Sequence, residues 1–332
     1  MKKDTKKKSF IDKFDFWATN SEEGGWDISS TDEGSQKMLE EENEKQIKIQ
    51  TGTDVIDDFV IDEETSDDER MIVNMGPQHP STHGVLRLQA ELEGEVVRRV
   101  KPIIGYLHTG MEKTGEELNY FQGPTNTTRM DYLSPLFNEL VFSLTTEKLI
   151  GIEVPERAKN IRILMTELNR ISSHLVALAT GGMDIGALSM MIFGFREREL
   201  ILNFFEKTTG LRMNHNYIRP GGVAADLPDG WQKDVKEILK IIPEKLQDYD
   251  DMLLDNPIWK GRLQNVGILT TEECFAYGVT GPSLRASGHS WDLRKSQPYS
   301  GIENFDFKVP VLNEGDVFAR WRIKVLEIFE SL

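Results

Sequence analysis

A long stretch of helical periodicity in the middle of the chain constrains the fold more than any other feature. Residues 154–180 read VPERAKNIRILMTELNRISSHLVALAT, with apolar side chains at 161, 164, 165, 168, 171, 175 and 178. That spacing places them along one face of an α-helix. Pro155 suits the first turn, and we expect Gly181-Gly182 to stop the helix. The pattern predicts a long helix with one face against a core.

The helical pattern restarts directly after the two glycines. Residues 184–210, DIGALSMMIFGFRERELILNFFEKTTG, begin with Asp184 as an N-cap and finish at a glycine. Two long helices joined this closely form an antiparallel hairpin. We expect further helices over 133–150 and over 229–254, so that residues 133–255 form a helical bundle.

The segments on either side of the bundle have other patterns. Residues 69–132 contain MIVNM and the alternating run VLRLQAELEGEVVRRV, which predict a small antiparallel sheet with a reversal at Glu93-Gly94. Residues 256–311 are rich in turn signals and predict an irregular loop region with one short strand at 305–309. Residues 312–332 predict a helix in which the chain ends. The fold class expected is α+β and mainly α: a small N-terminal sheet followed by a long-helix bundle.

The acidic charge lies mostly near the N-terminus. Residues 1–70 carry 10 Lys and Arg against 21 Asp and Glu, which is −11 of the formal net charge of −16. Residues 1–68 also lack apolar periodicity, so we expect a disordered acidic leader. No basic stripe with interleaved aromatic residues is visible, which argues against a nucleic-acid ligand.

The lengths of the apolar runs and the number of cysteines limit where the protein can be located and which cofactors it can hold. No apolar run approaches the roughly 20 residues that a transmembrane helix needs, and no signal peptide follows the basic start. Cys274 is the only cysteine, which excludes an intrachain disulfide and an iron–sulfur cluster held by this chain alone. We expect no metal or cluster bound by this chain.

The stretch GPQHPSTHGVLRL, residues 76–88, places two histidines four positions apart. Such a pair forms a zinc-binding face on a helix, but Pro77, Pro80 and Gly84 oppose helix formation here. Two interpretations of the residues alone stay open: His79 and His83 satisfy the loop backbone, or they serve a metal hydrolase together with Asp184.

Several long segments together closely resemble the 49 kDa-type subunit, also lettered D, of proton-pumping NADH:quinone oxidoreductase, respiratory complex I. That family is related to the large subunit of nickel-iron hydrogenases. The resemblance covers about residues 69–332. It rests on NMGPQHPSTHGVLRL, GYLHTGMEKT, TRMDYLSPLFNE, ELNRISSHLVALATGGMDIGA, FGFRERE, NHNYIRPGGV, GPSLRASG and DLRKSQPYSGIE. The paired CxxC motifs that hold the hydrogenase metals are absent, which excludes hydrogen chemistry at nickel.

The resemblance implies a partner-dependent redox subunit. It implies packing against an iron–sulfur small subunit, which holds the terminal 4Fe-4S cluster, against a neighbouring peripheral-arm subunit, and against a membrane-arm subunit at the quinone channel. It also implies a peripheral location on the cytoplasmic face of the plasma membrane. Quinone is then the substrate, and its reduction is coupled to proton translocation. The alternative within this family is an assembly scaffold with a non-functional site.

Individual site residues follow from the same resemblance. It implies that His83 and Tyr132 hydrogen-bond the two quinone carbonyls, where a phenol and an imidazole stabilise the developing negative charge. Asp184 matches an acidic position coupled to His83 and to the proton pathway; from the residues alone a helix cap is the preferred explanation, and the two roles are compatible. Arg129 matches an arginine close to the partner's cluster, and His79 belongs to the quinone loop.

One departure from the family bears on the electron chemistry. Asn214 stands where many members have a histidine near the cluster, with His215 one residue later. Because an asparagine takes up no proton, we expect a low, nearly pH-independent cluster potential, which suits menaquinone rather than ubiquinone. His108 and His174 are assigned to turn and helix packing, with no partner evident for either.

Overall fold

The computed structural model describes residues 70–79, 82 and 84–332. The predicted acidic leader, residues 1–68, and the predicted quinone ligand His83 lie outside the described residues. Two compact units are recognised in the described chain: residues 70–74 with 89–101, and residues 75–88 with 102–332. The second unit contains all the helices described below.

A three-stranded sheet lies near the start of the described chain. Its strands are β1 (Arg70–Met75), β2 (Arg87–Glu93) and β3 (Val96–Ile103), in the order β1-β2-β3. β2 and β3 are joined by a two-residue turn at Gly94 and Glu95, one position later than the predicted reversal. The expected small N-terminal sheet is therefore confirmed.

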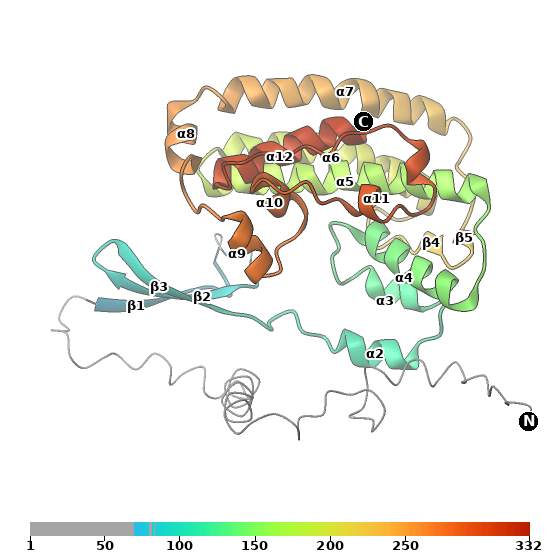
Figure 1. The fold of residues 1–332 in the computed structure, drawn as a ribbon, viewed down its shortest axis with the longest axis horizontal. Helices are drawn as coiled ribbons and strands as arrows, with labels where there is room; N and C mark the ends of the chain where they lie inside the picture. Colours follow the sequence, from blue (N-terminus) through green and yellow to red (C-terminus); the bar gives the residue numbers. More distant parts are fainter. Residues whose placement is uncertain (1–69, 80–81, 83) are drawn as a thin grey trace, which may run out of the picture. The chain divides into compact units, whose positions relative to one another are not determined.

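Helices make up most of the second unit, so the mainly helical α+β class is confirmed as well. The short α2 (Met111–Glu117) and α3 (Gly123–Thr127) precede the four long helices α4 (Pro135–Ile150), α5 (Glu156–Asp184), α6 (Leu188–Thr209) and α7 (Trp231–Leu253). α5, α6 and α7 run alongside one another in Figure 1. Between α6 and α7, the short strands β4 (Ile218–Arg219) and β5 (Gly222–Val223) pair antiparallel.

The predicted hairpin of two long helices is present, but its turn lies elsewhere. α5 continues through Gly181 and Gly182 and ends at Asp184, so the predicted stop at the glycines was wrong. α6 has Ala187 as its N-cap residue, so Asp184 does not cap it. α6 ends as expected at Gly210, which adopts a left-handed φ of 83°. The glycine pair of α5 therefore does not act as a helix stop.

α5 and α6 approach each other closely where one of them carries a glycine. A Cβ placed on Gly182 would lie 2.6 Å from the Cβ of Met190, and one on Gly194 would lie 2.7 Å from the Cβ of Ala179. Real Cβ atoms do not approach that closely, so any larger residue forces the helices apart. The hairpin core is packed tightly enough that a side chain at either position destabilises it.

The region from residue 256 to 311, expected to be irregular, contains several short helical segments. They are α8 (Pro257–Leu263), α9 (Thr271–Ala276), α10 (Gly281–Ala286), α11 (Leu293–Ser296) and the 3₁₀ turn η6 (Ile302–Asn304). Residues 305–309 form no strand, which corrects the prediction there. The segment leads into α12 (Val317–Ser331), which packs against α5 and α10.

A buried ion network ties α12 to α5 and α10. Glu327 is 1% exposed and accepts hydrogen bonds from His174 Nε2 at 2.8 Å and from Arg285 Nε at 2.7 Å. Burial lowers the pKa of His174, so its neutral ring donates to the carboxylate. His174 is structural, as predicted, but it has a partner that lies 153 residues away in the sequence.

The two adjacent glycines of α5 provide a matched test of the hairpin packing. Gly182→Ala should lower the free energy of unfolding by about 1–3 kcal/mol, because its methyl group collides with Met190. Gly181→Ala should raise it by about 0.5–1 kcal/mol, because nothing lies within 4 Å and alanine favours the helix. Urea denaturation of the purified chain measures both, and equal effects of the two substitutions would contradict the packing argument.

Candidate functional site

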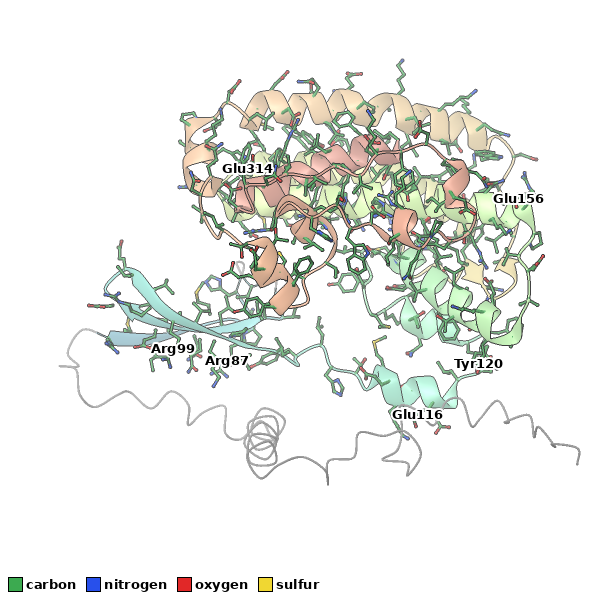
Figure 2. The ribbon with its side chains drawn as sticks, in the orientation of Figure 1. Arg87, Arg99, Glu116, Tyr120, Glu156 and Glu314 are labelled. Atoms are coloured by element: carbon green, nitrogen blue, oxygen red, sulfur yellow. The ribbon has the colours of Figure 1, made fainter. Side chains whose placement is uncertain are left out.

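Tyr132 lies in a turn between α3 and α4 and is half exposed, at 50%. Its neighbours in the chain include exposed apolar residues, namely Tyr120, Phe121 and Met130. Tyr120 points outward from the segment between α2 and α3 (Figure 2). Residues 120–132 thus expose four large aromatic or apolar side chains, and such exposure is typical of a segment that contacts a protein or ligand.

The backbone around Tyr132 is held by side chains of the two helices beside it. Asn169 of α5 donates through Nδ2 to Leu133 O at 3.0 Å and accepts at Oδ1 from Leu136 N at 3.2 Å. Asn138 of α4 donates to Asp131 O at 3.0 Å. Because Asn169 is buried, these bonds resist exchange with water. The turn therefore presents the Tyr132 hydroxyl from a rigid support.

Arg129 is exposed just before Tyr132 in the chain. Its Nη1 donates to Thr125 O and, at 3.2 Å, to Thr128 Oγ1. These partners are neutral, so the guanidinium keeps its charge uncompensated by them. Arg129 can therefore present a fixed positive charge three residues before Tyr132 in the chain.

The loop that carries Asn214 is anchored to α4 by a buried carboxylate that no sequence motif indicated. Glu139 is 0% exposed and accepts three backbone hydrogen bonds, from Asn216 N at 2.6 Å and from Tyr217 N and Ile218 N at 2.8 Å. Burial raises the pKa of Glu139 to about 7, against the opposing effect of these N–H donors. A glutamate on an apolar helix face is the one signal that the sequence offers for this role.

A second carboxylate, two turns further along α4, holds the other end of the same loop. Glu147 pairs with Arg162 of α5, with Nη2 to Oε1 at 2.5 Å, and accepts from Gly221 N at 2.8 Å. Arg162 also donates to the carbonyls of Arg219 and Gly222. α4 thus fixes the loop at both ends, and the same helix begins directly after the Tyr132 turn.

Asn214 and His215 have distinct environments within this loop. Asn214 adopts a left-handed φ of 54°, and its Oδ1 is buried with no hydrogen-bond partner among the described residues. His215 is buried: its Nε2 lies 3.0 Å from Arg212 O, and its ring meets the Phe205 ring edge-on. Burial lowers the pKa of His215 to about 4, so this histidine is neutral at physiological pH.

The remaining predicted residues are placed as follows. His79 is exposed and its carbonyl accepts from Thr82 N at 3.1 Å. Asp184 is exposed at the C-terminal end of α5. The hydroxyl of Ser173 in α5 lies 3.3 Å from that of Ser134, beside the Tyr132 turn. Ser173 precedes Asp184 by eleven residues, which is about 16 Å along the helix. α5 thus carries Asp184 at its C-terminal end and contacts the segment beside the Tyr132 turn about 16 Å earlier along the same helix.

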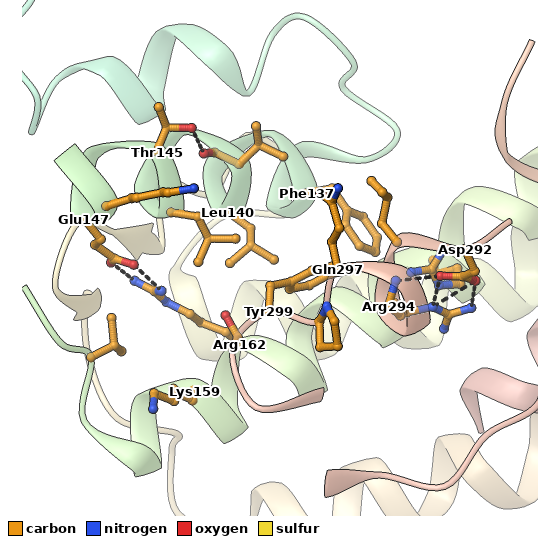
Figure 3. Close-up of a pocket in the computed structure, with 18 of the residues that line it drawn as sticks. Phe137, Leu140, Thr145, Glu147, Lys159, Arg162, Asp292, Arg294, Gln297 and Tyr299 are labelled. Atoms are coloured by element: carbon orange, nitrogen blue, oxygen red, sulfur yellow. Dashed lines mark hydrogen bonds and ion pairs between the residues drawn. The ribbon is translucent and has the colours of Figure 1, made fainter. Parts of the chain in front are cut away.

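A groove of about 1360 Å³ lies between α4, α5 and the segment from 280 to 300 (Figure 3). The Arg162–Glu147 pair and the Arg294–Asp292 pair both border it, and apolar side chains such as Leu140 line it. None of the described residues predicted for the quinone site lines this groove.

Metal ligands and membrane spans can be judged for the described part of the chain. Within residues 70–79, 82 and 84–332, no three His, Cys, Asp or Glu side chains gather in a way that could hold a metal ion. Over the same residues, no helix is both long and apolar enough to cross a bilayer.

Comparison with known proteins identifies the family. The family model of the respiratory-chain NADH dehydrogenase 49 kDa subunit matches residues 184–332. The D subunit of NADH-quinone oxidoreductase from Mycobacteroides abscessus is 55% identical over 289 residues, covering 86% of this chain and 67% of the relative. The chain belongs to the D-subunit family of NADH-quinone oxidoreductases.

Other relatives of the same family agree with this assignment. The D subunit from Rhodococcus jostii is 59% identical over 80% of this chain and 61% of its own length, and the D 1 subunit from Salinispora arenicola is 58% identical over 80% and 60%. The chain thus spans about 60–67% of the length of these relatives. Family membership favours the redox-subunit interpretation over the metal hydrolase.

The anchor at Glu139 has a testable pH signature. Because its pKa is higher in the folded chain than in the unfolded one, the folded chain binds more protons between pH 4.5 and about 7. The stability that Glu139 contributes therefore falls as pH rises through this window, by at most about 1.4 kcal/mol per pH unit.

Glu139→Gln should remove this slope and lower stability by about 1–3 kcal/mol, because an amide NH₂ replaces an acceptor of backbone N–H groups. Glu206→Gln, on the exposed face of α6, is the control that removes the same charge without the anchor. Urea unfolding from pH 4.5 to 8 gives the slopes. A variant slope equal to that of the wild type would refute the assignment.

Proposed function

We propose that this chain forms the quinone-reduction site of a proton-translocating NADH:quinone oxidoreductase together with an iron–sulfur subunit. The match to the Mycobacteroides abscessus relative carries the proposal, since 289 aligned residues must include the Tyr132 turn and the Asn214 loop. The rigid support of the half-exposed Tyr132 hydroxyl agrees with a group that meets a ligand. The names of the relatives supply the reaction class.

In this proposal Tyr132 and His83 donate hydrogen bonds to the two carbonyl oxygens of the quinone. Reduction adds two electrons and two protons, and the negative charge that develops on each oxygen is stabilised by a donor already in place. Asp184 supports the charge and proton balance of His83 from the end of α5, and His79 belongs to the same loop. A tyrosine on a pinned turn loses little entropy when the ligand binds.

Arg129 is the proposed electrostatic partner of the cluster in the iron–sulfur subunit. Its guanidinium is positioned by Thr125 and Thr128, both neutral, so its charge is available to a neighbouring group. A fixed positive charge beside a cluster favours the reduced state. The exposed aromatic surface of residues 120–132 is the part of the chain that we expect this subunit to cover.

The loop chemistry supports the proposal that the cluster potential is low and nearly independent of pH. Asn214 carries no titratable group, and the neighbouring His215 stays neutral because it is buried. Because no histidine of this loop exchanges protons near neutral pH, the loop takes up no proton when the cluster is reduced. Such a potential suits menaquinone better than ubiquinone.

We further propose that the chain works at the cytoplasmic face of the plasma membrane, bound between a neighbouring peripheral-arm subunit and a membrane-arm subunit. The alternative is an assembly scaffold whose quinone site has no activity. The two differ in whether the Tyr132 hydroxyl matters to the reaction.

Tyr132→Phe decides between the site and the scaffold. In membranes from cells whose only copy of the gene carries this change, quinone reduction by NADH should fall about 100-fold, because one donor to the reacting oxygen is lost. Reduction of ferricyanide by NADH, which needs no quinone site, should stay unchanged. Tyr120→Phe removes a similarly exposed hydroxyl twelve residues earlier in the chain and should leave both rates as in the wild type.

If Tyr132→Phe leaves both rates unchanged, the scaffold interpretation is favoured instead. If both rates vanish, immunodetection of the assembled complex separates lost assembly from a different electron donor.

Asn214→His tests the proposed link between this loop and the cluster. Histidine tolerates the left-handed backbone at this position better than most residues, so the loop should fold. The cluster midpoint, followed by redox titration with electron paramagnetic resonance, should then fall by up to about 59 mV per pH unit near neutral pH. The wild-type midpoint should stay nearly constant, and a wild-type midpoint that titrates would exclude this proposal.

A further inference from the structure

Arg198 of α6 is a buried cation that forms no ion pair with any carboxylate of the described residues. It is 7% exposed, and its Nε is buried with no hydrogen-bond partner in that part of the chain. Its Nη2 lies 3.5 Å from the sulfur of Met213, and its guanidinium carbon lies 5.7 Å from the centre of the Phe195 ring. A thioether is a weak acceptor and a ring face carries no charge, so the guanidinium is left largely unsatisfied.

The acidic residues on either side of Arg198 in the sequence are already engaged. Glu197 accepts from Arg196 Nε at 2.7 Å and from the Tyr249 hydroxyl. Glu199 is held by both terminal nitrogens of Arg212, at 2.7 and 2.6 Å. Neither carboxylate forms an ion pair with Arg198, and Arg212 adds a second positive charge nearby.

The same corner of the chain contains other unsatisfied polar atoms. Met213, which touches Arg198, begins the loop segment in which Asn214 Oδ1 and Asn216 Oδ1 are both buried without partners among the described residues. Burial and the repulsion by Arg212 lower the pKa of Arg198, and the attraction of Glu199, which forms no ion pair with it, only partly opposes them. Removing a charge from water without pairing it is strongly unfavourable, so native chains rarely leave one in this state.

We propose that Arg198 is the receptor for an acidic side chain, an Asp or Glu, of a protein that docks over the Met213–Asn216 loop. The free N–H groups of a guanidinium match a carboxylate in geometry and charge. Met213 touches Arg198 and is 40% exposed, so a partner that covers Met213 also seals the ion pair from water.

Removing the charge should have opposite effects on the isolated chain and on the complex. Arg198→Met keeps the aliphatic stem, so it should raise the thermal midpoint of the purified chain by about 2–4 °C, because an unpaired buried charge disappears. Arg157→Met, which breaks the exposed pair with Asp226, is the control and should leave the midpoint unchanged. If Arg198 served only the chain itself, Arg198→Met would lower the midpoint, which overturns the proposal.

The partner's carboxylate can be trapped directly. The experiment uses the assembled oxidoreductase purified from cells that carry Arg198→Lys. It rests on the proposed function only because it requires that this complex forms. A carbodiimide activates carboxylates, and an amine in contact with one attacks it to form an amide as the urea leaves. Mass spectrometry should find an amide between position 198 and an Asp or Glu of another subunit, and none from position 157 in Arg157→Lys.

The outcomes separate this inference from the proposed function. An assembled, quinone-reducing complex without any cross-link from position 198 overturns the inference alone. A cross-link in a complex that does not reduce quinone supports the inference and counts against the proposed function. A cross-link within the chain overturns the inference. Binding of a free anion to Arg198 would also overturn the inference. It would be recognised if acetate in place of chloride stabilises the wild type but not Arg198→Met, while no cross-link forms.

Discussion

The close contact of α5 and α6 is the constraint on which the rest of the helical unit depends. Gly182 and Gly194 let the two helices approach so closely that the side chain of Met190 lies against Gly182 and that of Ala179 lies against Gly194. α5 then offers its other faces to α4 and α12, and α6 offers one to α7. A wider hairpin would displace the elements that pack against it, including the helices beside the Tyr132 turn.

Buried charges connect this hydrophobic framework to the surface loops. Glu139 and Glu147 of α4 hold the loop from Asn214 to Gly222, and Glu327 joins α12 to α5 and α10 through His174 and Arg285. Each carboxylate is surrounded by donors from distant parts of the chain. Such a fully bonded buried group specifies one arrangement, because any shift leaves a charge without partners. The loops are therefore positioned by electrostatics and the helices by packing.

Both kinds of contact meet at the candidate site. Tyr132 and Asn214 belong to segments that approach the same helix, α4, through its N-terminal end and through Glu139. Arg198 differs from these buried ions because no carboxylate of the described residues forms an ion pair with it, and its Nε has no hydrogen-bond partner there. A buried charged group without a partner needs an explanation, and the proposed carboxylate of a docked protein supplies one.

Local pattern was sufficient for the elements, since helical periodicity predicted α4 to α7 and alternation predicted the small sheet. The resemblance, carried by long segments such as ELNRISSHLVALATGGMDIGA, was sufficient for the family and supplied Tyr132, Asp184 and Arg129 as candidates. Local pattern failed at Gly181-Gly182, because a glycine pair looks the same whether it ends a helix or admits a neighbouring one. The roles of Glu139 and Arg198, and the link between His174 and Glu327, depended on residues up to 153 positions apart meeting in space. The sequence by itself thus determined periodicity and kinship, whereas only the tertiary structure decided which buried charges are paired, because pairing depends on distances that no local pattern encodes.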